Sequence, residues 1–169
     1  MLCIFAYFCL LINIIYGIFK RKREKRKYAK IHKRYYEKLK EISLNTNHLT
    51  DEEIANIVEY NEKKRIKSNE IRIITQLLAE IKTEFEDQIN ELNFQGIQNV
   101  FQITRYFERE LQFGPQRSKI QTLKLIQSIN GYASEAVLVR FLYHRELELR
   151  NSARYAYTVS YTHLRAHET

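Results

Sequence analysis

The sequence predicts an all-α protein in which an N-terminal transmembrane helix is followed by α-α helical hairpins. The 169 residues include one Pro and four Gly, too few for the many turns of a β-sandwich or barrel. Charged residues make up 28% of the chain and are rich in Lys and Glu, which suit helices. In several segments apolar residues recur every three or four positions, which is the spacing of one helix face.

Composition divides the chain into five segments. The total charge is +8 with His neutral, but residues 20–40 alone hold twelve Lys or Arg and two Glu, so the remainder carries a net charge of −2. The basicity therefore belongs to one segment. In order, we expect a transmembrane anchor (1–19), a basic juxtamembrane stalk helix with a linker (20–48), a helical region (49–115), a truncated unit of paired helices (116–158) and an artefactual tail (159–169).

The predicted anchor is the uncharged run 2–19, LCIFAYFCLLINIIYGIF. As a helix, its eighteen residues span roughly 27 Å, close to the hydrocarbon thickness of a bilayer. Eleven of them are Leu, Ile or Phe, which together favour insertion by about 3 to 7 kcal/mol, more than Asn13 opposes. The side chains that we assign to membrane anchoring are Leu2, Phe5, Phe8, Leu11, Ile15 and Phe19.

A secretory signal peptide is the alternative interpretation of this run. A signal peptide has positive residues before its apolar run and small residues at a cleavage site, whereas only Met1 precedes this run and KRKREKRK follows it. Positive flanks stay on the cytoplasmic side of a membrane. We therefore expect a single-pass protein of the inner (cytoplasmic) membrane, with its N-terminus outside and its C-terminal domain in the cytoplasm.

The basic stalk contains no helix breaker, so we expect it to continue the transmembrane helix up to a polar linker, EISLNTNHL. Basic residues beside a membrane helix stop its transfer and attract anionic lipid head groups. A nucleic-acid interface is the alternative, because Tyr28, Tyr35 and Tyr36 lie among the basic residues and aromatic rings stack on bases. The predicted contacts with anionic lipid are Lys20, Arg21, Lys22, Arg23, Lys25, Arg26 and Lys27.

The helical region 49–115 begins with a predicted capping box formed by Thr50 and Glu53. Apolar residues at three- and four-residue spacing then predict one amphipathic helix over 69–92. We interpret Gly96 as an interruption before another helix over 97–112, which the Gly-Pro pair that follows ends.

The unit of paired helices contains three predicted helices, over 118–129, 135–143 and 148–157. An Asn130-Gly131 turn separates the first two. Superposition of the first helix on the third gives an offset of 31 residues, near the period of helical-pair repeats.

The segment ELRNSARYA, residues 148–156, resembles the E-x-R-x-x-A-x-x-A opening of bacterial HEAT helices. Together with the preceding helices it resembles a HEAT repeat running into the next one, and the layout is similar to bacterial membrane-anchored HEAT-repeat proteins. The resemblance implies a short HEAT-like, armadillo-like α-solenoid, with Arg150 making polar contacts between repeats. The packing residues that it implies are Leu123, Ile126, Leu138, Phe141, Arg150, Ala153 and Ala156.

The last eleven residues, VSYTHLRAHET, resemble a translated sequencing adapter. We therefore expect an artefactual tail on a truncated chain, with further repeats missing. His163 and His167 lie four residues apart, but in such a tail they do not indicate a metal site.

No pattern in the sequence indicates catalysis. A phosphate-binding loop, a dinucleotide-binding glycine motif, a nucleophile elbow and a zinc-protease motif are all absent from the sequence. The remaining histidines are far apart and lack partners at ligand spacing. We therefore expect no enzyme activity, no cofactor and no metal.

The favoured function is a membrane-tethered helical-repeat scaffold that mediates protein–protein interaction at the cytoplasmic face. Tyr132, Tyr143, Arg140 and Arg145 are candidates for the interaction surface, because Tyr and Arg carry much of the binding energy of interfaces. The first alternative is an accessory or regulatory subunit of a separately encoded membrane enzyme, contacted through Asn13 and the stalk. A membrane-proximal nucleic-acid binder is the second.

Overall fold

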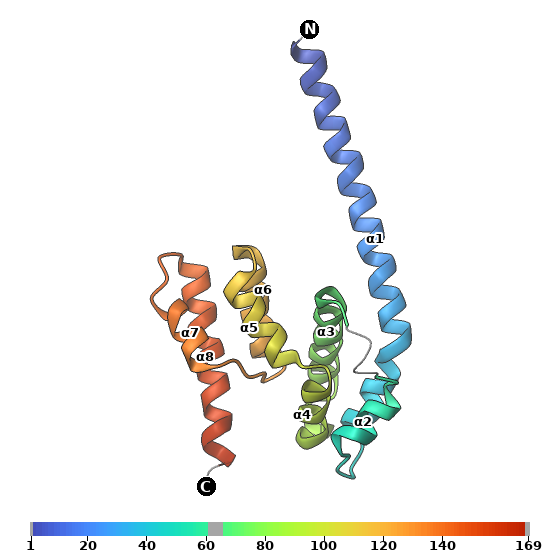
Figure 1. Ribbon diagram of the computed structural model, residues 1–169, viewed down its shortest axis with the longest axis vertical. Coiled ribbons are helices and arrows are strands. Elements are labelled where there is room, and N and C mark those ends of the chain that lie inside the picture. The colour runs from blue at the N-terminus through green and yellow to red at the C-terminus, as the bar shows by residue number, and fades with distance from the viewer. Residues whose placement is uncertain (1, 61–65, 168–169) are drawn as a thin grey trace.

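The computed structural model describes the backbone over residues 2–60 and 66–167, and side chains over 10–60 and 66–161. All regular structure in these ranges is helical (Figure 1), so the all-α prediction is confirmed. The elements are α1 (Leu2–Leu44), α2 (Asp51–Ile57), α3 (Ser68–Glu84), the 3-10 turn η1 (Glu86–Gln88), α4 (Glu91–Val100), α5 (Ile103–Phe113), α6 (Gln116–Ser128), α7 (Glu135–Leu142) and α8 (Leu147–His167).

The last four helices form two packed pairs, α5–α6 and α7–α8, whereas α3 and α4 each pack on α1 and α5 more than on each other. Figure 1 shows α7 and α8 at one side, then α5 and α6, then α3 and α4, with α1 and α2 at the other side. The contacts agree with this order, since α1 packs on α3 and α4, α3 on α5 and α6, and α6 on α8. A single apolar core therefore runs from the C-terminal half of α1 to α8.

The basic stalk continues the preceding segment as one helix, as the sequence predicts, because α1 runs unbroken from Leu2 to Leu44. Its second half also forms part of the domain. Ile31, Tyr35, Leu39 and Ile42 are buried at a spacing of three or four residues, which places them on one face of the helix. The second half of the stalk therefore packs in the apolar core, and α1 ends at Leu44, inside the predicted linker.

Over the part of the chain that the structure describes, no helix has both the length and the apolarity needed to cross a membrane. Leu2, Phe5 and Phe8 of the predicted anchor lie outside the residues whose side chains are described.

Two helix boundaries differ from the sequence prediction. The helix predicted over 69–92 ends at Glu84, and a new helix begins at Glu91 after Asn90, whose side chain accepts hydrogen bonds from the first turn. Gly96 does not interrupt a helix: it lies buried inside α4. The break comes instead at Gln102, which has a φ of 51° and precedes α5.

Gly96 marks a close approach between α4 and α2. A Cβ at this position would lie 2.6 Å from Ile54 Cδ1 and 3.2 Å from Asp51 Oδ1. The predicted capping box of Thr50 and Glu53, which is confirmed, sets the start of α2, and Ile54 is fully buried in the core, so its side chain has little room to move away. Close packing of α4 on α2 therefore explains why a glycine occupies this position.

Asn93 joins α4 to the end of α1. Its side-chain nitrogen donates to the carbonyl oxygens of Ile42, Asn45 and Asn47 at 3.2, 3.0 and 2.8 Å, and its side-chain oxygen accepts from the Leu49 amide at 2.8 Å. Asn93 is fully buried. One side chain thus satisfies the backbone of the turn that follows α1.

The C-terminal helices largely follow the sequence prediction. The Gly-Pro pair ends α5, and the Asn130-Gly131 turn follows α6, with Asn130 at a φ of 49°. However, α8 does not end at Tyr157 but continues to His167, through most of the predicted tail. Within that tail Ser160 is buried and donates a hydrogen bond to the Gly131 carbonyl oxygen at 3.2 Å.

Candidate functional site: the projecting part of α1 and a groove beside α5

The first feature of functional interest is the part of α1 that projects beyond the other helices (Figure 1). Its large apolar side chains from residue 10 to 19 are between 38% and 68% exposed. Nothing approaches within 4 Å of the position of a Cβ on Gly17. The exposed residues of this apolar end are Leu10, Leu11, Ile12, Ile14, Ile15, Tyr16, Ile18 and Phe19.

These side chains surround the helix rather than form one stripe. Successive helical residues are rotated by about 100°, so consecutive apolar residues such as Leu10, Leu11 and Ile12 point in different directions. A helix that is apolar all round is typical of an element enclosed by an apolar medium, whereas a helix that packs on one partner needs one apolar face.

A ring of charge, here called the basic collar (residues 20–27), follows the apolar end directly. All of the predicted lipid contacts are in it, and all are exposed except Lys27, which is half-buried. The single carboxylate in the collar, Glu24, lies 3.3 Å from Arg72 on α3 and 3.8 Å from Lys27. The acidic residue of the collar is therefore paired within the chain, and six of its cations face outward.

Three side-chain contacts fix the first half of the stalk to α3. Beyond the pair of Glu24 and Arg72, the Tyr28 hydroxyl donates to Glu80 at 2.7 Å, and the Tyr36 hydroxyl donates to Glu84 at 2.9 Å. Burial, followed by the hydrogen bond to Glu80, raises the pKa of Tyr28 to about 12. The pKa of Tyr36 is also raised, and the hydrogen bond to Glu84 is the main cause.

The tyrosines of the stalk therefore hold the domain together. Tyr35 is buried and meets the ring of Phe101 edge-on, with 5.7 Å between ring centroids. Tyr36 stacks on His32, with 4.6 Å between centroids. Rings engaged in this way do not form a free platform for bases, which weighs against the nucleic-acid alternative.

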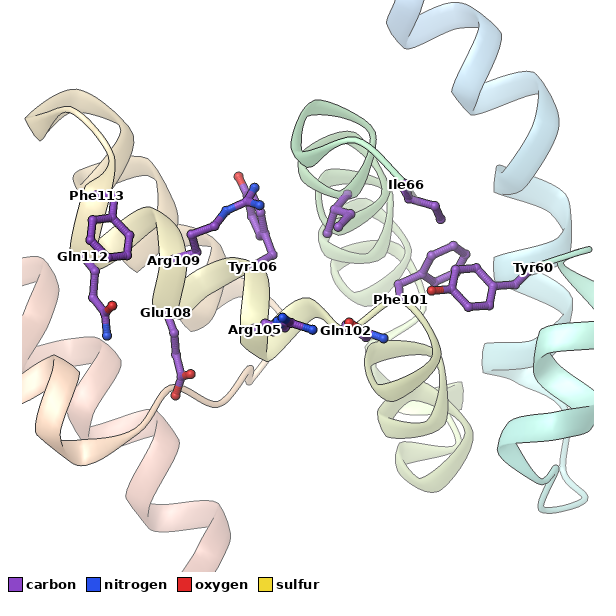
Figure 2. A pocket seen from close by; sticks show the side chains of 11 residues that line it. Tyr60, Ile66, Phe101, Gln102, Arg105, Tyr106, Glu108, Arg109, Gln112 and Phe113 are labelled. Carbon is purple, nitrogen blue, oxygen red and sulfur yellow. The ribbon is translucent and has the colours of Figure 1, made fainter. Parts of the chain in front are cut away.

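The second feature is an open groove of about 680 Å³ beside α5 (Figure 2). Tyr60 and Phe101 form part of its wall, with their rings 5.7 Å apart and nearly perpendicular. Tyr106 and Phe113 lie further along α5, and the ring of Phe113 is 81% exposed. Residues 61–65, which follow Tyr60 in the sequence, lie outside the described part of the chain.

Two arginines give the groove its charge. Arg105 and Arg109 line it one helical turn apart, and neither is paired with a carboxylate of the described residues. The one carboxylate among the described lining residues, Glu108, accepts a hydrogen bond from the Ser134 amide at 3.3 Å. Aromatic rings beside two guanidinium groups suit a partner segment with carboxylate and apolar side chains.

The described lining of the groove contains no His, Cys or Ser, so it lacks a nucleophile–base pair of the usual kind. The pKa of Tyr106 is raised to about 12, mainly by burial. Its hydroxyl is therefore protonated at neutral pH. Among the described side chains no group of three His, Cys, Asp or Glu is placed to hold a metal ion.

The residues implied by the HEAT resemblance lie where α6, α7 and α8 meet. Six are buried: Leu123, Ile126, Leu138, Phe141, Ala153 and Ala156. Arg150 is different, because its Nε is buried without a hydrogen-bond partner in the described structure, so the expected polar contact of that nitrogen is not observed.

The four candidates for an interaction surface, Tyr132, Tyr143, Arg140 and Arg145, are all exposed. They lie on the α6–α7 connection, on α7 and on the α7–α8 connection, away from the groove. The sequence did not predict Arg105 and Arg109 as binding residues. Their spacing of four residues on a helix was a signal, but the wall opposite them comes from distant parts of the sequence.

Comparisons with known proteins add no relative to these observations. The chain matches no protein-family model, and neither a curated protein nor a solved structure matches it.

Proposed function

We propose that the chain is a membrane-tethered helical scaffold that binds a partner protein at the cytoplasmic face. In this proposal residues 2–19 cross the bilayer, the basic collar lies at the cytoplasmic head groups, and the domain from Tyr28 to α8 presents the binding surface. The observation that carries the tether is the apolar end of α1, exposed all round and followed at once by the collar.

Water is an unfavourable environment for such a surface, since each exposed apolar side chain loses the gain of burial. A single partner helix would cover only one side of it. A bilayer covers all sides, and the collar then lies where lipid head groups begin. Each basic residue there contributes about 1 kcal/mol of attraction to an anionic leaflet, and the positive flank favours a cytoplasmic domain.

Partner binding is assigned to the paired helices, with the groove of Arg105 and Arg109 as its centre. The pairs α5–α6 and α7–α8 pack side by side through α6 and α8, as neighbouring units of a short HEAT-like solenoid do. A tether adds to such a surface by raising the local concentration of membrane-bound partners. The partner chemistry that fits is an acidic segment with an aromatic or aliphatic side chain.

Asn13 supports the second candidate, an accessory subunit of a membrane enzyme. Its side chain is exposed in the middle of the apolar end, and an amide within a bilayer favours a hydrogen-bond partner on another helix. Recovery of a partner from detergent with and without residues 1–19 separates the two functions. Binding that needs those residues supports the subunit, and binding by the domain alone supports the scaffold.

The tether is tested by extraction of membranes with alkaline carbonate. The full chain is expected to stay in the membrane pellet, and Leu11→Lys combined with Ile15→Lys is expected to release it. The matched control places the same two charges at exposed apolar positions of the domain, Val139→Lys and Tyr155→Lys, and should remain in the pellet. Release of the unaltered chain would refute the tether.

A further inference from the structure

Two connections between helices lie at the end of the domain from which α1 projects. Figure 1 shows that α5 and α7 run toward that end, where each turns back into α6 and α8. The first connection follows Phe113 and the second begins at Tyr143. We call residues 113–117 and 143–147 together the domain rim.

The rim includes the two most exposed large apolar side chains in the described part of the chain. Phe113 is 81% exposed and Tyr143 is 83% exposed, while Leu147 at the start of α8 is 60% exposed. Single exposed apolar residues are common on protein surfaces, whereas a group of them marks a contact surface.

Hydrogen bonds hold the two connections together and keep them ordered. The Gln116 side chain donates to the Glu146 carboxylate, which joins one connection to the other. The amide of Glu146 in turn donates to His144 Nδ1 at 3.2 Å. On the α5 side, the Ser118 hydroxyl donates to Glu110 at 2.6 Å. The exposed rings of Phe113 and Tyr143 therefore belong to connections that are held by hydrogen bonds.

Among the described residues of the rim, the basic side chains are unpaired, whereas the acidic side chains have partners. Arg117 and Arg145 are exposed and make no ion pair with a described carboxylate. The neighbouring acids are engaged, since Glu146 accepts from Gln116 and Glu148 lies 2.9 Å from Lys124. Aromatic rings beside unpaired cations match the head-group region of an anionic bilayer, where Trp, Tyr and basic residues collect.

The distance to the membrane is limited by the rigidity of α1. If the bilayer ends at Phe19, Glu24 lies five positions further along the helix, and it already contacts Arg72 of α3. Five helical residues rise by about 7.5 Å. The contacts of Tyr28 and Tyr36 with α3 fix the domain on α1 below that point, so the end of α3 at Arg72 lies within about one Debye length of the surface.

We propose that the domain rim is a second membrane-contact surface, which rests on the same leaflet that the basic collar touches. Phe113, Tyr143 and Leu147 enter the head-group region, and Arg117 and Arg145 bind lipid phosphates. The domain thus contacts the bilayer at two places, the basic collar and the domain rim. This inference depends on the proposed tether, and it adds an orientation of the domain that the tether alone does not give.

The chain contains no Trp, so one substitution at a time provides a fluorescent reporter. Phe113→Trp and Tyr143→Trp report on the rim, and Tyr155→Trp, at a 68% exposed position in the middle of α8, is the matched control. Each full chain is reconstituted into anionic vesicles, with and without lipids brominated near the head group. Flotation of the vesicles verifies insertion.

We expect both rim reporters to show blue-shifted emission and quenching by brominated lipid several times stronger than the control. Charge reversal by Arg117→Glu with Arg145→Glu should reduce that quenching. Equal quenching of rim and control reporters in floating vesicles overturns the rim contact and leaves the tether intact. A blue shift without quenching also overturns it, since a protein then covers the surface. A chain that fails to float refutes the tether and the rim together.

Discussion

The Tyr28 hydroxyl lies 2.7 and 2.9 Å from the two carboxylate oxygens of Glu80, and this contact joins the stalk to α3. Together with the contact of Tyr36 and Glu84, it adds polar contacts to the apolar packing, from Ile31 to Ile42, that already holds α1 on the domain. Tyr28 and Tyr36, whose rings would stack on bases in the nucleic-acid alternative, make contacts within the chain.

Replacement of Tyr28 by Phe should destabilise the domain, because the carboxylate of Glu80 loses its donor. We expect a loss of about 0.5 to 1.5 kcal/mol in the free energy of unfolding, measured by urea denaturation. Tyr155→Phe, at an exposed site, is the control and should change stability little. An equal effect of the two substitutions would contradict the role of Tyr28.

The same contact predicts a dependence on alkaline pH. The folded-state pKa of Tyr28 is about 12, above the value of about 10 in an unfolded chain. The folded chain therefore holds this proton more tightly, so the stabilisation is complete below pH 10 and is lost as pH rises toward 12. In a spectrophotometric titration Tyr28→Phe should remove one of the late-ionising tyrosines.

Asn93→Ala should be among the most damaging polar substitutions in the domain. It removes a donor to three carbonyl oxygens and the acceptor of the Leu49 amide in a fully buried site. We expect a loss of about 2 to 4 kcal/mol. Asn56→Ala, on the exposed side of α2, serves as the comparison, and a similar loss there would argue against the specific function of Asn93.

Gly96 and Ile54 should behave as a coupled pair. Gly96→Ala gains helix propensity but places a methyl group 2.6 Å from Ile54 Cδ1, and overpacking of this kind costs about 1 to 3 kcal/mol. Ile54→Val removes that carbon. The double variant should therefore be less destabilised than the sum of the single changes, and simple additivity would show that the close approach has no energetic weight.

Neutralisation of the basic collar should alter orientation. Gln at positions 20, 21 and 22 removes about 3 kcal/mol of attraction to an anionic leaflet, so a larger share of chains should insert with the domain on the wrong side. Protease access to the domain from each side of the membrane measures that share. Gln at Lys33, Arg140 and Arg154 removes the same charge elsewhere and should leave orientation unchanged.

The groove makes its own prediction. Charge reversal by Arg105→Glu with Arg109→Glu should abolish capture of a detergent-extracted partner, while membrane insertion and helix content stay the same. Arg154→Glu, an exposed substitution on α8, should preserve capture. If the groove variant retains the same partners at the same yield, binding lies on another face.

Local signals in the sequence predicted the helical class, the capping box of Thr50 and the turn at Asn130, because each depends on a few adjacent residues. The end of α3 was missed because apolar residues continue at helical spacing through Ile89 and Leu92, beyond the actual end at Glu84. Asn90, the N-cap of α4, was the available sign of a new start.

Other features depend on contacts between distant segments. Gly96 is compatible with either a break or a close approach, and only the position of Ile54 decides between them. The buried stripe of the stalk, from Ile31 to Ile42, was obscured by the surrounding charge. The groove required Tyr60 and Arg105 to meet across forty-five residues of sequence, which no local pattern specifies.

The unbroken α1 has a mechanical consequence. If residues 2–19 cross a bilayer as proposed, no hinge separates the bilayer from the domain, so a tilt of the membrane part tilts the groove through the same angle. Transmembrane helices adjust their tilt to bilayer thickness. Under the proposed function, a thicker or thinner membrane should therefore change the orientation of the groove and with it the partners that the groove can reach.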